Sequence, residues 1–441
     1  MEVWPARSGG HSLTIKVAPK KKKNRLESGR AAFGWHLKVF TFRARIKRFY
    51  FWRNAMDICD AVKYVGVDDH EIDLFEGQFE VPGGMAYNSY VILDDKVCVM
   101  DSVDANFGDQ WLSNIEAVLG ERKPDYLVVQ HMEMDHSANV MRFAQKYPEA
   151  KIVASKVAFS IMKNMFQTDF PERQLVVAEG SLLDLGTRKL RFVSAPNVHW
   201  PEVVMTYDKE DKILFSADAF GKFGALDYDD PEGWDCEARR YYFGIVGKFG
   251  SAVQALLKKV SALDIKVICP LHGPVLDKDL AHYIGQYDTW SSYGVESQGV
   301  ALAYTSVYGH TKQAAEKLAQ ILKDKGCPKV AIFDLAREDI YECVEDAFRY
   351  GKLVLASTTY CGGVFPAMRE FIQHLTERNY QKRTVAFIEN SSWNPAAAKT
   401  MASLLEPCAD IKFAETKVSI KVSMKDADIA ALEKLAEELL G

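Results

Sequence analysis

The spacing of apolar and polar residues after residue 55 predicts two successive α/β domains. From residue 56 to 290, short apolar runs rich in β-branched and aromatic residues predict strands, and stretches with helical spacing lie between them. The predicted strands are residues 89–93, 126–130, 151–154, 190–195, 212–216 and 266–269. This pattern indicates a layered α/β domain over residues 56–290.

The second half of the chain follows a more regular order of strand, loop and helix. Predicted strands at 300–304, 330–333, 353–356 and 384–388 accompany predicted helices at 311–325 and 429–440. Such alternation favours a parallel, doubly wound sheet. The polar stretch 291–298 precedes the first of these strands and is expected to be a linker, so the second domain covers residues 299–441.

Composition narrows the class of protein. The chain has 441 residues, of which 48% are hydrophobic, as expected for a folded protein. No stretch approaches the roughly 18 to 20 apolar residues of a membrane helix, and no secretory signal opens the chain, so we expect a cytoplasmic protein without a membrane partner. The eight cysteines form no CxxC pair, which predicts reduced thiols rather than a zinc ribbon.

The first 55 residues differ from the rest in charge. They contain 14 Lys or Arg and two Glu, a net charge of +12, whereas the whole chain carries −5 and the remaining residues therefore −17. The negative charge of residues 56–441 argues against a nucleic-acid partner. Because regular patterning begins at Met56, we expect residues 1–55 to be a non-native or disordered extension and Met56 to be the true start. A flexible arm and an organelle transit segment are the alternatives.

Seven potential metal ligands lie just after predicted strands. They are His131, Glu133, Asp135, His136, His199, Asp218 and His272. Strand ends gather at one edge of an α/β domain, so we expect these side chains to meet there. Four imidazoles and three carboxylates suffice for two metals if Asp218 bridges them. This donor set suits iron or manganese better than zinc, and the absence of HExxH argues against a helix-borne zinc protease.

The turn after the predicted strand 300–304 has the composition of a phosphate-binding loop. Its residues are Thr305, Ser306, Val307, Tyr308, Gly309, His310 and Thr311. Backbone N–H groups and hydroxyls at the start of a helix attract phosphate, although an ordinary capped helix turn is the alternative. Two further loops are predicted to follow parallel strands. They contain Ser357, Thr358, Thr359, Tyr360, Cys361, Gly362 and Gly363, and Asn390, Ser391, Ser392 and Trp393.

The metal motif and the later loops together resemble the flavodiiron proteins. The resemblance covers residues 56–441 and implies an N-terminal αββα metallo-β-lactamase-like domain followed by a flavodoxin-like domain that binds FMN through the three loops. It implies that one iron is bound by His131, Glu133 and His199 and the other by Asp135, His136 and His272, with Asp218 bridging. In some members of the family the histidine equivalent to His136 is not a ligand.

Three more stretches resemble the family: residues 87–90 (Tyr-Asn-Ser-Tyr), 199–202 (His-Trp-Pro-Glu) and 237–242, which ends in Tyr241 and Tyr242. Either tyrosine is a candidate catalytic proton donor near the irons. Buried structural tyrosines are the alternative.

The resemblance also implies a function. We expect an oxidoreductase that reduces O2 to water, NO to N2O, or both, with electrons relayed through FMN to a di-iron centre. A separate donor such as rubredoxin would supply the electrons, and a head-to-tail homodimer or homotetramer would place one subunit's flavin against its partner's irons. A zinc-dependent hydrolase fused to a flavin-binding domain and a non-catalytic flavin electron carrier are the rival interpretations.

Overall fold

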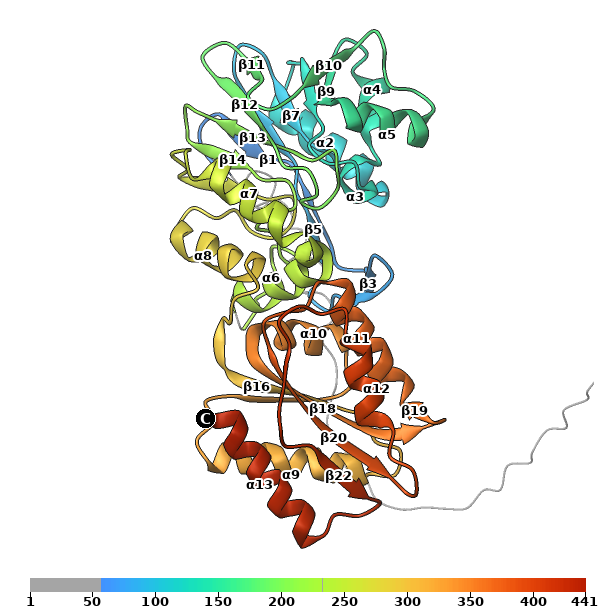
Figure 1. Cartoon of the computed structure of the whole chain (residues 1–441). Helices are drawn as coiled ribbons and strands as arrows, with labels where there is room; N and C mark the ends of the chain where they lie inside the picture. The colour runs from blue at the N-terminus through green and yellow to red at the C-terminus, as the bar shows by residue number, and fades with distance from the viewer. Residues whose placement is uncertain (1–56, 232) are drawn as a thin grey trace, which may run out of the picture. The chain divides into compact units, whose positions relative to one another are not determined.

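The computed structural model describes residues 57–231 and 233–441 (Figure 1). The fold described below belongs to the unit Arg53–Gly441. The expectations for residues 1–55 and for Met56 as the true start lie outside the described residues. Within the described ranges, no helix combines the length and the apolar composition needed to cross a membrane.

Two mixed sheets form the N-terminal domain. The first has the order β1-β6-β7-β8-β9-β10, and the second has the order β11-β12-β13-β14-β15. The strands of the first are β1 (Val62–Tyr64), β6 (Tyr90–Ile92), β7 (Cys98–Met100), β8 (Tyr126–Val128), β9 (Lys151–Ser155) and β10 (Gln174–Val177). Those of the second are β11 (Leu182–Asp184), β12 (Lys189–Ser194), β13 (Val204–Asp208), β14 (Ile213–Phe215) and β15 (Val267–Cys269). Two small pairs complete it: β2 (Val67–Asp69) with β5 (Met85–Tyr87), and β3 (Leu74–Phe75) with β4 (Phe79–Glu80).

Helices cover the outer faces of these sheets (Figure 1). The helical segments of the domain are η1 (Ala105–Phe107), α2 (Gly108–Leu119), α3 (Met134–Ser137), α4 (Val140–Lys146), α5 (Lys156–Phe166), α6 (Asp235–Tyr241), η2 (Tyr242–Val246), η3 (Gly247–Phe249), α7 (Gly250–Val260) and α8 (Leu280–Ser291). Residues of α2, α4 and α5 pack in one cluster with the first sheet, and residues of α7 pack with the second. Alternate side chains of a strand face opposite layers. Cys98 and Met100 pack with Phe192 between the sheets, whereas Val99 packs with Trp111 of α2. The predicted αββα architecture is confirmed.

A parallel sheet with the order β17-β16-β18-β20-β21 forms the C-terminal domain, and β22 also pairs with β20. Its strands are β16 (Ser297–Tyr304), β17 (Val330–Asp334), β18 (Tyr350–Tyr360), β20 (Thr384–Ser391), β21 (Lys412–Phe413) and β22 (Val418–Lys421), with the short antiparallel β19 (Gly363–Val364) beside β18. In chain order this is the 2-1-3-4-5 arrangement of flavodoxin-like folds. The predicted doubly wound sheet is confirmed.

Five helices flank this sheet: α9 (His310–Asp324), α10 (Ile340–Arg349), α11 (Pro366–Glu377), α12 (Ala397–Leu404) and α13 (Asp426–Leu440). Along β16, Val300 and Leu302 pack in the cluster that contains residues of α9 and α13, whereas Ala301 and Ala303 face the cluster that contains residues of α10 and α11. The continuous apolar run of this strand is therefore explained by burial on both faces.

Three predicted boundaries differ from the observed elements. Helix α8 ends at Ser291 and β16 begins at Ser297, so both run into the predicted linker 291–298. Strand β18 continues to Tyr360 and β20 continues to Ser391, so the two predicted loops begin inside strands rather than after them. The division into domains at 56–290 and 299–441 remains a proposal.

Candidate metal centre and flavin site

The structure brings the seven predicted metal donors together at the strand ends of the N-terminal domain. His131 and Glu133 follow β8, and Asp135 and His136 lie on the short helix α3. The other three each follow a strand of the second sheet: His199 after β12, Asp218 after β14 and His272 after β15. The donors form two groups, in each of which the ligand atoms lie within 4.8 Å of one another.

In each group a carboxylate stands between two imidazoles. Glu133 Oε2 lies 2.9 Å from His199 Nε2 and 3.2 Å from His131 Nε2. In the second group, Asp135 Oδ2 lies 3.2 Å from both His136 Nε2 and His272 Nε2. Each group therefore presents two imidazole nitrogens and a carboxylate oxygen to one metal position.

Asp218 joins the two groups. Its Oδ2 lies 3.2 Å from His131 Nε2 and 3.2 Å from His199 Nε2. Its Oδ1 lies 3.2 Å from His136 Nε2 and 3.8 Å from His272 Nε2. Because each oxygen faces a different group, the geometry fits a bridging ligand between two metals.

The buried carboxylates of this cluster favour bound cations. Both oxygens of Asp218 and both of Asp135 are buried without an aligned hydrogen-bond donor among the described residues. A buried carboxylate in that state is costly unless a positive charge compensates it. Two metal ions satisfy this requirement while the imidazoles bind as neutral ligands.

The pKa shifts of the metal-free cluster also show that its carboxylates are stabilised by positive charge. Burial tends to lower the pKa of His199, but the carboxylates of Asp218 and Glu133, which lie 3.2 Å and 2.9 Å from its Nε2, outweigh it and raise that pKa to about 9. Burial likewise opposes the charge of Asp218, yet His131 and His136 hold its pKa well below the usual range. Without metal, protonated imidazoles therefore provide the positive charge that the carboxylates require.

Outer contacts orient the ligand rings. Glu202 Oε1 accepts a hydrogen bond from the backbone N–H of Met132 and lies 2.8 Å from His131 Nδ1, so His131 donates from Nδ1 and turns Nε2 to the metal position. His272 Nδ1 lies 2.8 Å from the carbonyl oxygen of Ala86, with the same consequence. Such partners fix the tautomer and orientation of metal-binding histidines. The sequence motif at 199–202 contained Glu202 but gave no sign of this role.

The two candidate tyrosines lie in different places. The ring of Tyr241 packs edge-on against His272, with centroids 5.4 Å apart, and burial together with the carboxylates of Asp218 and Asp135 raises its pKa. Tyr242 instead packs against Tyr287 and Trp290, with centroids 5.1 Å and 5.4 Å away. The structure therefore brings Tyr241, and not Tyr242, to the donors.

The predicted phosphate loop connects β16 to α9. Thr305 is buried, with Oγ1 2.9 Å from Ser357 Oγ, and the N–H of Gly309 donates to Ser306 Oγ. Gly309 has φ of +90°, a left-handed conformation that glycine adopts without strain. His310 Nδ1 is buried and has no hydrogen-bond partner in the described part of the chain. A helix start with free polar groups fits a phosphate.

The other two loops combine exposed aromatic rings with side chains that hold the loops in place. Tyr360 and Trp393 are 45% and 87% exposed, and Tyr308 of the first loop is 89% exposed, so these rings are available to a planar ligand. Thr359 Oγ1, in contrast, accepts from the N–H groups of Ala396 and Ala397 at the start of α12.

Like Thr359, Asn390 holds neighbouring backbone in place. Its amide bonds to both the carbonyl and the N–H of Val422, which follows β22. Of the remaining predicted residues, Thr358 donates to the carbonyl of Asn390, Cys361 and Gly362 turn the chain at positive φ, and Val307 and Ser392 are exposed.

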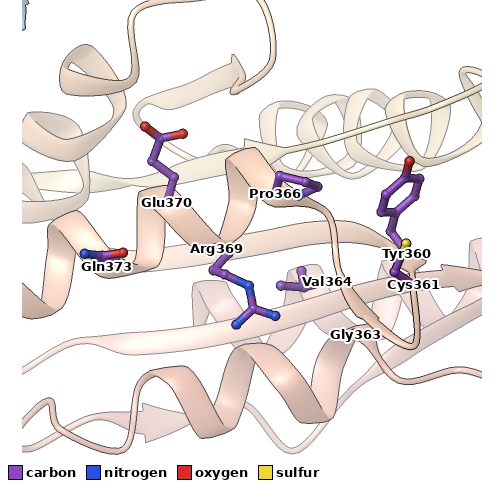
Figure 2. Close-up of a pocket in the computed structure, with 8 residues that line it drawn as sticks. All are labelled: Tyr360, Cys361, Gly363, Val364, Pro366, Arg369, Glu370 and Gln373. Carbon is purple, nitrogen blue, oxygen red and sulfur yellow. The ribbon is translucent and has the colours of Figure 1, made fainter. Parts of the chain in front are cut away.

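A pocket of about 610 Å³ adjoins the second flavin loop (Figure 2). Its lining residues come from the end of β18, from β19 and from α11, and Figure 2 shows Arg369 and Gln373 on the helix opposite the hairpin. The lining residues are Tyr360, Cys361, Gly363, Val364, Pro366, Arg369, Glu370 and Gln373. This pocket therefore belongs to the flavin-binding domain and not to the metal centre.

The fold and the two sites define a protein that joins a dinuclear metal centre to a flavodoxin-type flavin domain. Residues 85–273 match the family described as ODP family beta lactamase, and residues 301–415 match the flavodoxin domain. An anaerobic nitric oxide reductase flavorubredoxin from Aliivibrio salmonicida is 30% identical over 84% of this chain and 75% of its own length. The crystal structure of the flavodiiron protein from Giardia intestinalis has a TM-score of 0.81 and 26% identity, covering 88% of this chain and 97% of that chain.

The chain belongs to the flavodiiron protein family. It is an oxidoreductase that uses FMN and two iron ions. The donor set and the helix start after β16 fit these cofactors. A diflavin flavoprotein from Synechocystis is 32% identical over 62% of this chain, and the match spans about half of that relative (48%).

Proposed function

We propose that this protein reduces O2 to water and NO to N2O at the metal centre, with electrons that pass through FMN. One observation carries the proposal: Glu133 occupies the first metal position with His131 and His199, while Asp218 spans both positions. A carboxylate-rich pair of sites suits iron. The name of the Aliivibrio relative, a nitric oxide reductase, supports NO as a substrate.

The electron count explains why the two cofactors share one chain. Reduced FMN holds two electrons and two ferrous ions give one each, which together supply the four electrons that convert O2 to water. Conversion of two NO molecules to N2O needs only two. Electrons stored beforehand allow the gas to be reduced without release of superoxide or peroxide.

The protein's own residues hold the centre and supply protons. Glu202 and the carbonyl of Ala86 orient His131 and His272, so the ligand geometry is set before a gas arrives. The ring of Tyr241 packs against His272 and is buried, which supports a role for its hydroxyl beside the centre. We propose that Tyr241 donates protons to reduced oxygen species there.

Neither rival interpretation is favoured. A zinc hydrolase would be expected to use more nitrogen ligands, and here Glu133 stands between two imidazoles. A non-catalytic electron carrier would be expected to lack part of the ligand set, and all seven donors converge.

Partners and location follow from the same proposal. We infer that a separate donor such as rubredoxin reduces the FMN in the cytoplasm, and that a head-to-tail homodimer or homotetramer brings the flavin of one copy to the irons of the next.

The eight cysteines form no disulfide in the structure, in agreement with a reducing compartment. Sedimentation of the FMN- and iron-loaded protein would distinguish monomer, dimer and tetramer.

The test is anaerobic reduction followed by separate exposure to O2 and to NO, with iron, zinc and FMN measured on the same sample. The proposal predicts two irons and one FMN per chain and consumption of both gases. Two zinc ions with hydrolytic activity would favour the hydrolase instead. Fully loaded protein that consumes neither gas would overturn the proposed activity. Glu133→His should shift metal preference toward zinc and lower gas consumption.

A further inference from the structure

A short segment of the N-terminal domain, residues 86–90, contacts the loop that carries His272. Ala86 accepts a hydrogen bond from the ring of His272, and the hydroxyl of Tyr90 donates to the carbonyl of Pro270 at 2.9 Å. Between them, the backbone N–H of Asn88 donates to the carbonyl of Leu271 at 2.8 Å. The segment therefore holds both the ring of the ligand and the backbone beside it.

The side chain of Asn88 ties together the two ends of that loop. Its Nδ2 donates to the carbonyl of Pro270 at 2.9 Å and to the carbonyl of Gly273 at 2.8 Å. Its Oδ1 accepts from the hydroxyl of Tyr64 at 3.0 Å, and the residue is 0% exposed. Both amide protons and the amide oxygen are therefore used, and the residues on either side of His272 are held at one point.

The chemistry of this position requires a carboxamide. Two carbonyl oxygens face one side-chain nitrogen, which only a group with two N–H donors can satisfy. A carboxylate of the same shape would place negative charge against both carbonyls in a buried site, and an apolar side chain would leave both without this donor. Either change would release the loop. Metal ligands must be held to within about 0.5 Å of their working positions, so a released loop weakens binding.

We propose that Asn88 is a positioning residue for the second metal position, formed by Asp135, His136 and His272. It sets the affinity of that position through the loop and has little effect on the position of Glu133. The inference rests on the proposed metal centre, and it does not depend on which gas is reduced.

The test is an anaerobic titration of metal-free protein with ferrous iron, followed by a chelator challenge. Wild type should retain two irons per chain. Asn88→Asp should retain one, with the second bound about 10- to 100-fold more weakly, the usual cost of losing an outer partner of a metal ligand. Asn114→Asp is the matched control, because Asn114 Nδ2 also donates to two carbonyls, those of Val65 and Gly66, in the connection between β1 and β2, which carries no ligand. It should retain both irons.

A milder variant tests the proposal in case Asn88→Asp does not fold. Tyr64→Phe removes only the hydroxyl that orients the Asn88 amide, and it should weaken the second iron by a smaller factor while circular dichroism and FMN content stay unchanged. Glu202→Ala should loosen the other position, so the double variant with Asn88→Asp should retain neither iron.

Three results would overturn the inference. The first is Asn88→Asp retaining both irons as tightly as wild type, and the second is the folded variant losing both irons at once. The third is the double variant retaining as much iron as either single variant. Failure of the proposed function gives a different result, namely wild type that binds two irons and FMN but reduces no gas.

Discussion

Replacement of Asp101 by asparagine should stabilise the metal-free protein at neutral pH. Asp101 is fully buried, with Oδ1 accepting the backbone N–H of Gln130 at 2.7 Å and Oδ2 accepting its side-chain Nε2 at 2.9 Å. Burial raises the pKa of Asp101 to about 6, although Gln130, His136 and His131 oppose the shift. The carboxyl thus holds its proton in the folded chain at pH values where the unfolded chain has lost it.

The size of the effect follows from the difference between the folded and unfolded pKa values. An unfolded aspartate titrates near 3.9, and each pKa unit is worth about 1.4 kcal/mol, so ionisation of Asp101 costs the folded chain about 3 kcal/mol. Ionisation of Asp101 does not affect the free energy of unfolding below about pH 4. It lowers that free energy as pH rises to about 6 and has a constant effect above it. The substitution Asp101→Asn would remove this loss.

Local structure should accept the change. Asp101 has φ of +54°, a region that asparagine tolerates well. The oxygen of the new carboxamide can accept the Gln130 N–H, and its amide can donate to Gln130 Oε1 once that side chain flips. Gln130 Oε1 is buried and has no partner in the described part of the chain, so the flip sacrifices no existing bond to that oxygen.

The assay is urea unfolding of metal-free wild type and Asp101→Asn between pH 4 and 8, with labelling of the buried thiol of Cys98 to identify the transition of the N-terminal domain. The difference in the free energy of unfolding should grow in favour of the variant from pH 4 to 6, to about 3 kcal/mol, and then level off. Parallel curves, or a variant less stable at pH 7, would show that ionisation of Asp101 does not destabilise the fold.

Three further predictions concern the two sites. Glu202→Ala removes the acceptor that orients His131, and chelator competition should show about 10- to 100-fold weaker binding of one iron, with a smaller loss in Glu202→Gln. Tyr241→Phe should lower the turnover of gas about tenfold or more while iron content is unchanged, whereas Tyr242→Phe should keep wild-type turnover; equal rates in both variants would remove Tyr241 from the mechanism. Gly309→Ala forces a side chain into φ of +90° without meeting any atom within 4 Å, so fluorescence titration should show about 5- to 30-fold weaker FMN binding, and unchanged affinity would argue against the loop.

Much of the fold could be predicted because burial leaves a direct trace in the sequence. The parallel strand β16 is apolar on both faces and its helix α9 has regular spacing, so both elements were predicted close to their observed bounds. Strand β13 was not predicted. Its sequence, Val-Met-Thr-Tyr-Asp, is buried at every position, including the polar ones, so it shows neither alternation nor a purely apolar run.

The donors of the site could be predicted, but their supporting contacts could not. His131, Asp218 and their partners are chemically distinctive and follow strands, which is a local signal. Asn88 lies more than 180 residues from the loop it holds. An asparagine in a sequence is equally compatible with an ordinary turn, so its role could not be predicted. The separation of Tyr241 from Tyr242 likewise depends on the turn of α6 into η2, which the sequence does not reveal.

We propose that iron and FMN in this chain act as one electron store for gas reduction, which a single-turnover experiment can measure. Protein loaded with two irons and FMN is fully reduced without oxygen, freed of excess reductant and mixed with a known amount of O2. We predict that each chain consumes one O2 with oxidation of both cofactors and no hydrogen peroxide. Stoichiometric peroxide, or flavin oxidation that leaves the iron ferrous, would show that iron and FMN do not act as one electron store.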